Sequence, residues 1–113
     1  MNIPYEAMLE KHKAYCGDAI AQLAIGEIRG GGDKIGGILS NKAMTYAWCN
    51  MHNMRPQRKF DSSGELKKYY HKYGTKFEAM LYDTFIKEGY PAAKKIIMEF
   101  LVPVKEQTDL TYI

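Results

Sequence analysis

Apolar residues recur every three or four positions throughout the long segments of this 113-residue chain. This spacing gathers them on one face of an α-helix. A half-buried β-strand needs strict alternation of apolar and polar residues instead, and no stretch of useful length shows it. The sequence therefore predicts an all-α fold, a compact bundle of four to five helices. The predicted helices cover residues 4–29, 40–54, 63–73, 76–88 and 91–101.

Capping residues divide the central part of the chain. Ser40 is predicted to be the N-cap of the second helix. Ser62 and Glu65 form a capping-box pattern, in which two side chains satisfy backbone N–H groups of the first turn and so start a helix. Gly74 is predicted to end that helix as its C-cap, and Thr75 to cap the next one. We therefore expect a break in the middle of this region.

The remaining segments connect or follow the helices of a single domain, residues 1–113. They are a glycine-rich loop at 30–37, a basic linker at 55–62 and a short extended C-terminal tail at 102–113. The glycine-rich loop suggests a phosphate cradle, but no Gly-Lys-Ser/Thr follows it and no strand pattern precedes it. A flexible connection is the favoured interpretation.

The composition indicates a globular protein without a membrane-spanning segment. Hydrophobic residues make up 46% of the chain and charged residues 26%, which is ordinary for a folded domain. No apolar run approaches the roughly 20 residues that cross a bilayer. Charges interrupt the N-terminal stretch where a signal peptide needs apolar residues. We expect a cytoplasmic protein whose two cysteines are free thiols.

The second predicted helix carries the only tryptophan of the chain. At helical spacing, Trp48 shares a face with Met44, Ala47 and Met51. We therefore expect Trp48 in the core between the first and second helices.

Four soft-ligand candidates fall in two pairs. His12 and Cys16 are four positions apart on the first predicted helix, and Cys49 and His52 are three apart on the second. Each spacing places both side chains on one helix face, so an antiparallel hairpin could assemble a Cys2His2 zinc site. Buried cysteine is also common without a metal. We expect no cofactor, and zinc bound by these four residues stays open as an alternative.

No residue set with the arrangement of a catalytic centre is apparent. Neither cysteine has the local signature of a thiol enzyme. The carboxylates Glu78, Asp83, Glu88 and Glu99 are scattered over predicted helical surfaces, where solvation is the default. We therefore expect a non-enzymatic protein with no catalytic residues.

The strongest functional signal is the stretch 55–76, which has seven basic and two acidic residues. On a helix, its lysines fall on one side and its apolar residues on the other. The inward side is predicted to consist of Leu66, Tyr69, Tyr70 and Tyr73. The outward side and the linker supply the predicted partner-binding residues Arg55, Arg58, Lys59, Lys67, Lys68, His71, Lys72 and Lys76.

Two functions fit this cationic stretch. One is a small non-catalytic interaction module, a regulator or inhibitor like the accessory factors of phages. Through its basic Tyr/Arg-rich face it would dock on an acidic surface of a larger protein machine. Tyrosine, tryptophan, methionine and arginine are enriched at such interfaces. The alternative is a nucleic-acid-binding helical module using the same residues. A third interpretation is that the lysines form a merely solvated face and the tyrosines belong to the core.

Overall fold

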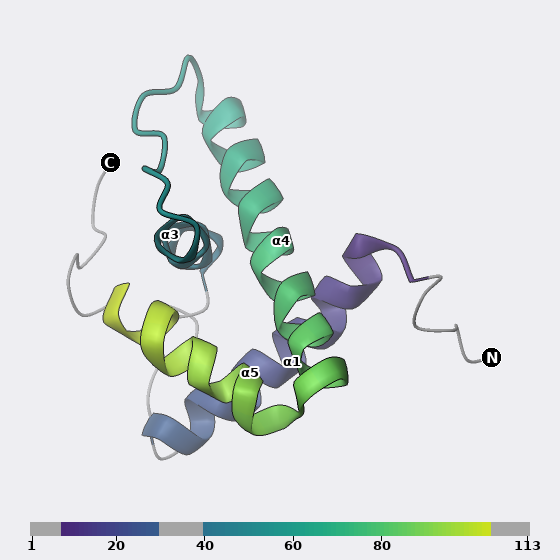
Figure 1. The fold of residues 1–113 in the computed structure, drawn as a ribbon. Coiled ribbons are helices and arrows are strands. Elements are labelled where there is room, and N and C mark those ends of the chain that lie inside the picture. Colours follow the sequence, from purple (N-terminus) through teal and green to yellow (C-terminus); the bar gives the residue numbers. More distant parts are fainter. Residues whose placement is uncertain (1–7, 30–39, 105–113) are drawn as a thin grey trace.

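The computed structural model describes residues 8–29 and 40–104, and over these ranges the chain forms helices, with a non-helical connection at 52–62, and contains no strand (Figure 1). The predicted all-α fold is confirmed. The helices are α1 (Glu10–Arg29), α3 (Asn41–Met51), α4 (Ser63–Glu88), α5 (Tyr90–Ile96) and the π-helix η2 (Ile97–Leu101). The predicted helical start at 4–7, the glycine-rich loop at 30–37 and most of the predicted tail lie outside the described residues.

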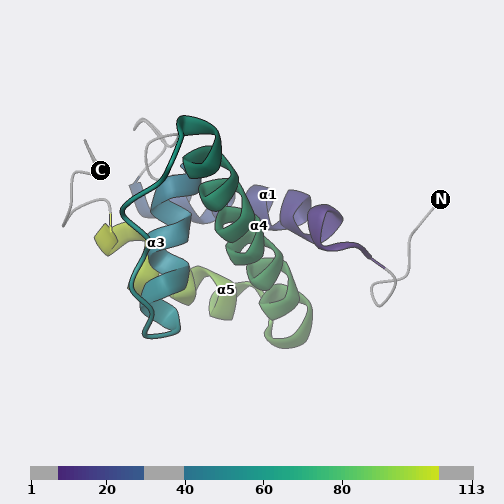
Figure 2. The ribbon, with the colours of Figure 1, turned by 90° about the horizontal axis from the view of Figure 1, so that it is seen from above.

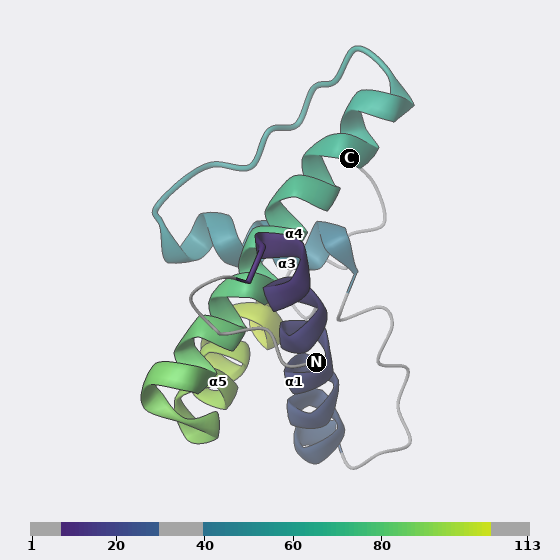
Figure 3. The same ribbon diagram turned by 90° about the vertical axis from the view of Figure 1, so that its right-hand side faces the viewer.

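Helix α4 is the scaffold on which the other helices pack. Both α1 and α3 contact α4 extensively, and α5 packs back against its end. Figure 2 shows α1 crossing behind α4, and Figures 1 and 3 show that α3 also crosses α4. The shared core draws on α1, α3, α4 and η2, while α5 packs against it with the partly buried Tyr90 and Ile96. Its buried side chains are Ala21, Ala24, Ile25, Ala43, Met44, Ala47, Phe77, Leu81, Ile97, Leu101 and Val104. The N-terminal half of α4 and the connection from α3 extend beyond this core (Figures 1 and 3).

Helices α1 and α4 touch backbone to backbone at Gly17. A Cβ atom added to Gly17 would lie 1.8 Å from the carbonyl oxygen of Glu78. No real Cβ atom approaches a backbone atom so closely, so only glycine fits at this crossing. Gly26, nine residues further along the same helix, has nothing within 4 Å of such a Cβ.

The predicted break between residues 73 and 76 is wrong, because α4 runs without interruption from Ser63 to Glu88. Gly74 is a buried residue inside the helix, not its C-cap. A Cβ atom at Gly74 would lie 2.5 Å from the side-chain oxygen of Asn41, at the first turn of α3. The glycine therefore serves helix–helix contact, and Thr75 continues the same helix.

The other predicted helix ends are close to the observed ones. Ser40 caps α3, its hydroxyl oxygen accepting from the Ala43 N–H at 3.1 Å. The Ser62 hydroxyl accepts from the Glu65 N–H at 3.1 Å, while the Glu65 carboxylate accepts from the N–H of the residue preceding the cap. Helix α3 ends at Met51, three residues earlier than predicted. At the other end of the chain, residues 102–104 are helical, so this part of the predicted extended tail is wrong.

Trp48 lies at the margin of the core and not at its centre. Its side chain is half-buried, whereas its neighbours Ala47 and Cys49 are fully buried. The Trp48 ring packs on the His52 ring, with centroids 4.2 Å apart. The expected central position between the first two helices is therefore wrong, because α3 turns its small residues and Met44 toward the core.

Candidate functional site

An aromatic cluster ties the basic linker to α4. The Phe60 ring lies 5.3 Å from the Tyr69 ring and 6.1 Å from the Tyr70 ring, and Tyr69 lies 4.9 Å from Tyr73, measured between centroids. The Tyr69 hydroxyl also accepts from the backbone N–H of Gln57 at 2.9 Å. Tyr70 is only 7% exposed. The rings therefore pack on one another and hold the connection against the helix, as offset and edge-on aromatic pairs do.

The lysines and arginines of this region point to solvent. We call the following exposed residues the basic tip: Arg55, Arg58, Lys59, Lys67, Lys68, His71 and Lys72. Within the described part of the chain, no lysine or arginine of the basic tip forms an ion pair. Lys72 instead lies over the Tyr73 ring, 5.3 Å from its centroid.

Four lysines elsewhere on the molecule are paired with carboxylates. Their ammonium groups lie 3.0–3.8 Å from carboxylate oxygens in the pairs Lys13–Asp83, Lys76–Glu10, Lys94–Glu27 and Lys95–Glu99. Lys76 was predicted to bind a partner with the others, but the structure places it half-buried against Glu10 of α1. Six lysines and arginines without a described carboxylate partner thus lie together in the basic tip, whereas exposed Lys11 and Lys87 lie apart on the body.

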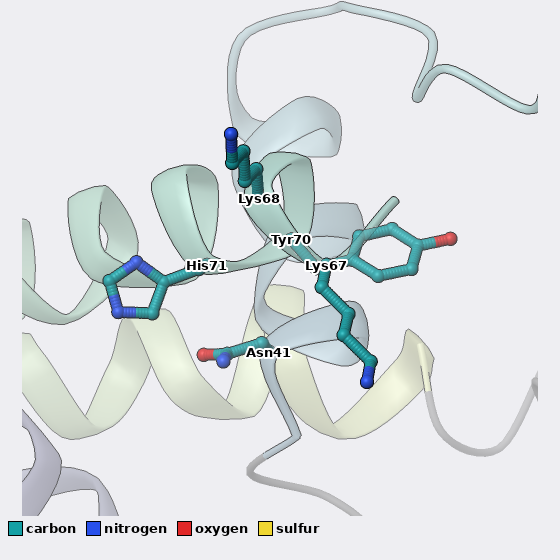
Figure 4. A pocket seen from close by; sticks show the side chains of 5 residues that line it. All are labelled: Asn41, Lys67, Lys68, Tyr70 and His71. Carbon is teal, nitrogen blue, oxygen red and sulfur yellow. The ribbon is translucent and has the colours of Figure 1, made fainter. Parts of the chain in front are cut away.

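Two open hollows lie within the basic tip. The first, which we call the Tyr70 groove, has a volume of about 560 Å³ and lies where the start of α3 meets α4 (Figure 4). Its described lining residues are Asn41, Lys67, Lys68, Tyr70 and His71. The second has a volume of about 550 Å³ and is lined by Arg58, Lys59, Phe60, Ser62, Ser63 and Leu66. The tip therefore offers concave surface as well as charge.

The hydroxyl and thiol groups behind the tip are held neutral by burial. Burial, together with the neighbouring Tyr46 and Tyr69 hydroxyls, raises the pKa of Tyr70 to about 12. Burial also raises the pKa of the Cys49 thiol, which contacts the Tyr69 hydroxyl. These groups carry no charge at neutral pH, so the electrostatic field of the tip comes from its lysines and arginines.

The four candidate zinc ligands do not meet as the sequence suggested. Cys49 is fully buried on α3 behind Tyr69, while His52 is exposed and packs on Trp48. His12 and Cys16 are half-buried on α1. Helices α1 and α3 each pack on α4 and do not form the expected hairpin. Over residues 8–29 and 40–104, no group of three or more His, Cys, Asp or Glu side chains is placed to hold a metal. Zinc binding stays a prediction.

The sequence did not reveal a carboxyl pair between α1 and α4. Glu78 was predicted to be solvated, but it is half-buried and hydrogen-bonded to Asp18. Burial, with the hydrogen bond and the charge of Asp18, raises the pKa of Glu78 to about 8. The two residues line a hollow of about 220 Å³ beside His71. Asp18 and Glu78 are 60 positions apart in sequence, so sequence spacing could not pair them. The one nearby clue was Gly17, whose lack of a side chain lets α1 and α4 touch.

The described residues show no further sign of a known functional class. None of the helices in the described ranges is long and apolar enough to cross a membrane. Outside the carboxyl pair, their acidic side chains mostly form ion pairs or helix caps or are exposed. The chain matches no family model, no curated protein and no solved structure.

Proposed function

We propose that this chain is a non-catalytic interaction module that binds an acidic surface of a larger protein through the basic tip. The observation that supports this proposal is the contrast between the two populations of lysines. Four lysines on the body of the molecule pair with carboxylates at 3.0–3.8 Å, whereas none of the lysines and arginines of the tip has such a partner in the described structure.

Concentrated charge of one sign favours an anionic partner. Like charges on one surface repel one another, and this repulsion is relieved when an acidic surface covers them. Such charges also steer association, so they raise the on-rate of binding more than they raise the affinity itself. The tip projects beyond the core (Figures 1 and 3), so it is accessible to a large partner.

The state of the tyrosines favours a protein partner over single-stranded nucleic acid. Single-strand binding uses aromatic faces on which bases stack. Tyr69 and Tyr70 pack on Phe60 and on each other, with ring centroids 5.3–6.1 Å apart. These rings are occupied within the molecule, so base stacking would require rearrangement. The formal net charge of the whole chain is only +3, modest for a dedicated nucleic-acid-binding domain.

Charge reversal tests the proposal. The double variant Arg58→Glu/Lys68→Glu changes two exposed residues of the tip. The variant Lys87→Glu/Lys95→Glu makes the same change of charge at two exposed residues outside it. The wild-type chain first captures its partner from a lysate of its host, and the purified partner is then used for kinetic binding measurements. The tip variant should weaken binding by about tenfold or more, mainly through a slower on-rate, because steering charges have been inverted.

The control variant should bind like the wild type, and both variants should keep the wild-type melting temperature within a few degrees, because exposed charges contribute little to stability. Unchanged binding by a folded tip variant would refute the proposal. A salt series on immobilised duplex DNA tests the nucleic-acid alternative, since phosphate contacts give a steep dependence of log affinity on log salt concentration.

A further inference from the structure

We propose that the Tyr70 groove is the anchor site of this interface and receives a peptide segment of the partner in which acidic residues flank one bulky apolar side chain. The inference rests on the proposed function and adds the chemistry of the ligand. The observation that supports it is that Lys67 and Lys68, which have no described carboxylate partner, line the same apolar hollow.

The walls of the groove are mainly apolar, although four of its five described lining residues are polar or charged. Carbon atoms dominate because long side chains line the groove with their stems, and lysine keeps its charged end in water. Figure 4 shows Lys67 extending beside Asn41 toward α3, while Lys68 points to the opposite side of α4. The result is a carbon-lined hollow with the Lys67 ammonium group at its edge.

The volume suits a single large side chain and its immediate neighbours. About 560 Å³ lies within the range of roughly 300–1,000 Å³ that is typical of ligand pockets. Tyr70 is 7% exposed and packs against Phe60 and Tyr69, so its ring face is not free for base stacking. An aliphatic or aromatic side chain that enters against the carbon atoms of the groove needs no such face. Apolar burial therefore favours a peptide here.

Charge complementarity determines what flanks that side chain. Lys67 and Lys68 are exposed and have no carboxylate partner among the described residues. Helix α3 begins at Asn41 and has no acidic residue in its first turn, so the partial positive charge of its N-terminus adds to theirs. Carboxylates flanking the apolar anchor would meet the Lys67 ammonium group and the N-terminus of α3, and Lys68 adds its charge from the other side of α4. A neutral apolar peptide would leave them without partners.

Selection from a random-peptide library displayed on phage, with the full chain as bait, tests the chemistry without assuming a partner. Enriched peptides should combine acidic residues with one bulky apolar residue. An enriched peptide, labelled with fluorescein, then reports affinity by fluorescence anisotropy. Enrichment of peptides that lack acidic residues, or no enrichment at all, would overturn the inference.

Matched variants place the peptide in the groove. Asn41→Trp fills the groove from an exposed position without changing the charge of the tip. Lys67→Glu reverses a charge at the groove, and Lys59→Glu makes the same reversal in the neighbouring hollow. The first two should each weaken peptide binding by about tenfold or more. Lys59 belongs to the basic tip but lines the neighbouring hollow, so Lys59→Glu should weaken peptide binding only through the long-range field, by no more than about threefold.

The outcomes separate this inference from the proposed function. Equal losses for Lys59→Glu and Lys67→Glu, with none for Asn41→Trp, would show that charge binds the peptide and the groove does not. If Asn41→Trp fails to fold, as judged by circular dichroism, the two lysine variants still test the groove. A larger loss for Lys67→Glu than for Lys59→Glu supports it, and equal losses refute it. Partner binding that is lost in Arg58→Glu/Lys68→Glu but kept in Asn41→Trp and Lys67→Glu would uphold the function and refute the groove. Groove-dependent binding of a labelled oligothymidylate in place of peptide would assign the site to nucleic acid.

Discussion

From the contact between α1 and α4 at Gly17 we predict that Gly17→Ala lowers the free energy of unfolding. Helix propensity alone predicts the opposite sign. Alanine is preferred over glycine inside a helix by about 1 kcal/mol. Gly17 and Gly26 both lie inside α1, so propensity alone predicts that alanine stabilises the protein at either position. The structure predicts that Gly17→Ala destabilises it and that Gly26→Ala stabilises it.

The magnitude follows from the distances. An added Cβ at Gly17 lies 1.8 Å from the Glu78 carbonyl oxygen and 2.6 Å from its carbonyl carbon. Both are backbone atoms, so no rotamer change relieves the overlap, and the helices must separate by about 1.5 Å to reach an ordinary contact. Overpacking of this kind costs about 3 kcal/mol or more, and the gain in propensity returns about 1 kcal/mol. We expect a net loss of about 2 kcal/mol or more in the free energy of unfolding.

Thermal and urea unfolding followed by circular dichroism measure this difference. For a domain of this size, about 2 kcal/mol corresponds to a drop of roughly 10–15 °C in melting temperature. Gly26→Ala is the matched control, because nothing lies within 4 Å of its added Cβ, and it should gain about 0.5–1 kcal/mol. A Gly17→Ala protein as stable as the wild type would refute the backbone contact between α1 and α4.

Three further predictions concern a carboxyl group, a helix cap and the thiols. Because the pKa of Glu78 is raised to about 8 in the folded protein, above its ordinary value of 4.5, stability should fall by about 1–2 kcal/mol as pH rises through this window, after allowance for partial solvent exposure. Glu78→Gln should remove this fall. Melting temperatures of both proteins are measured at a series of pH values, and equal slopes of melting temperature against pH would contradict the raised pKa of Glu78. Ser62→Ala should cost about 1 kcal/mol by removing the cap of α4, while Ser63→Ala costs far less, as urea unfolding would show. In the native protein a thiol reagent should modify half-buried Cys16 well before Cys49, which is fully buried and whose pKa burial raises. Fast modification of both would contradict this burial, and a rise in melting temperature on adding zinc would indicate that the thiols and nearby histidines assemble as ligands.

The caps and the helical class were predictable because they depend on neighbours in sequence. Ser62 and Glu65 act across one turn of the helix they start, and Ser40 acts in the same way on α3. The 3–4 spacing of apolar residues likewise requires only the geometry of a single helix. The outward position of the lysines on the basic tip follows from the same periodicity, which is why the candidate surface was visible before any tertiary contact was known.

The roles of Gly74 and Gly17 could not be predicted from the sequence. Gly74 has the local features of a helix end, yet α4 continues through it. Its lack of a side chain serves packing instead, because Asn41 of α3 occupies the space that a side chain would fill. Which of two roles a glycine plays, chain break or close contact, depends on what lies opposite, and that partner can be anywhere in the chain. The Asp18–Glu78 pair arises in the same way from the contact at Gly17.

The ion pairs of the lysines likewise depend on tertiary contacts that the sequence does not show. The sequence alone shows that 55–76 is rich in lysine and arginine, and helical periodicity places Lys67, Lys68 and Lys72 on the outward side of a helix. Only the tertiary structure decided that Lys76 reaches Glu10 of α1 while Lys67 and Lys68 reach no described carboxylate and border an apolar groove instead. The physical reason is range: helical periodicity and capping act over one turn of the chain, whereas an ion pair or a groove requires two elements brought together by packing of the core.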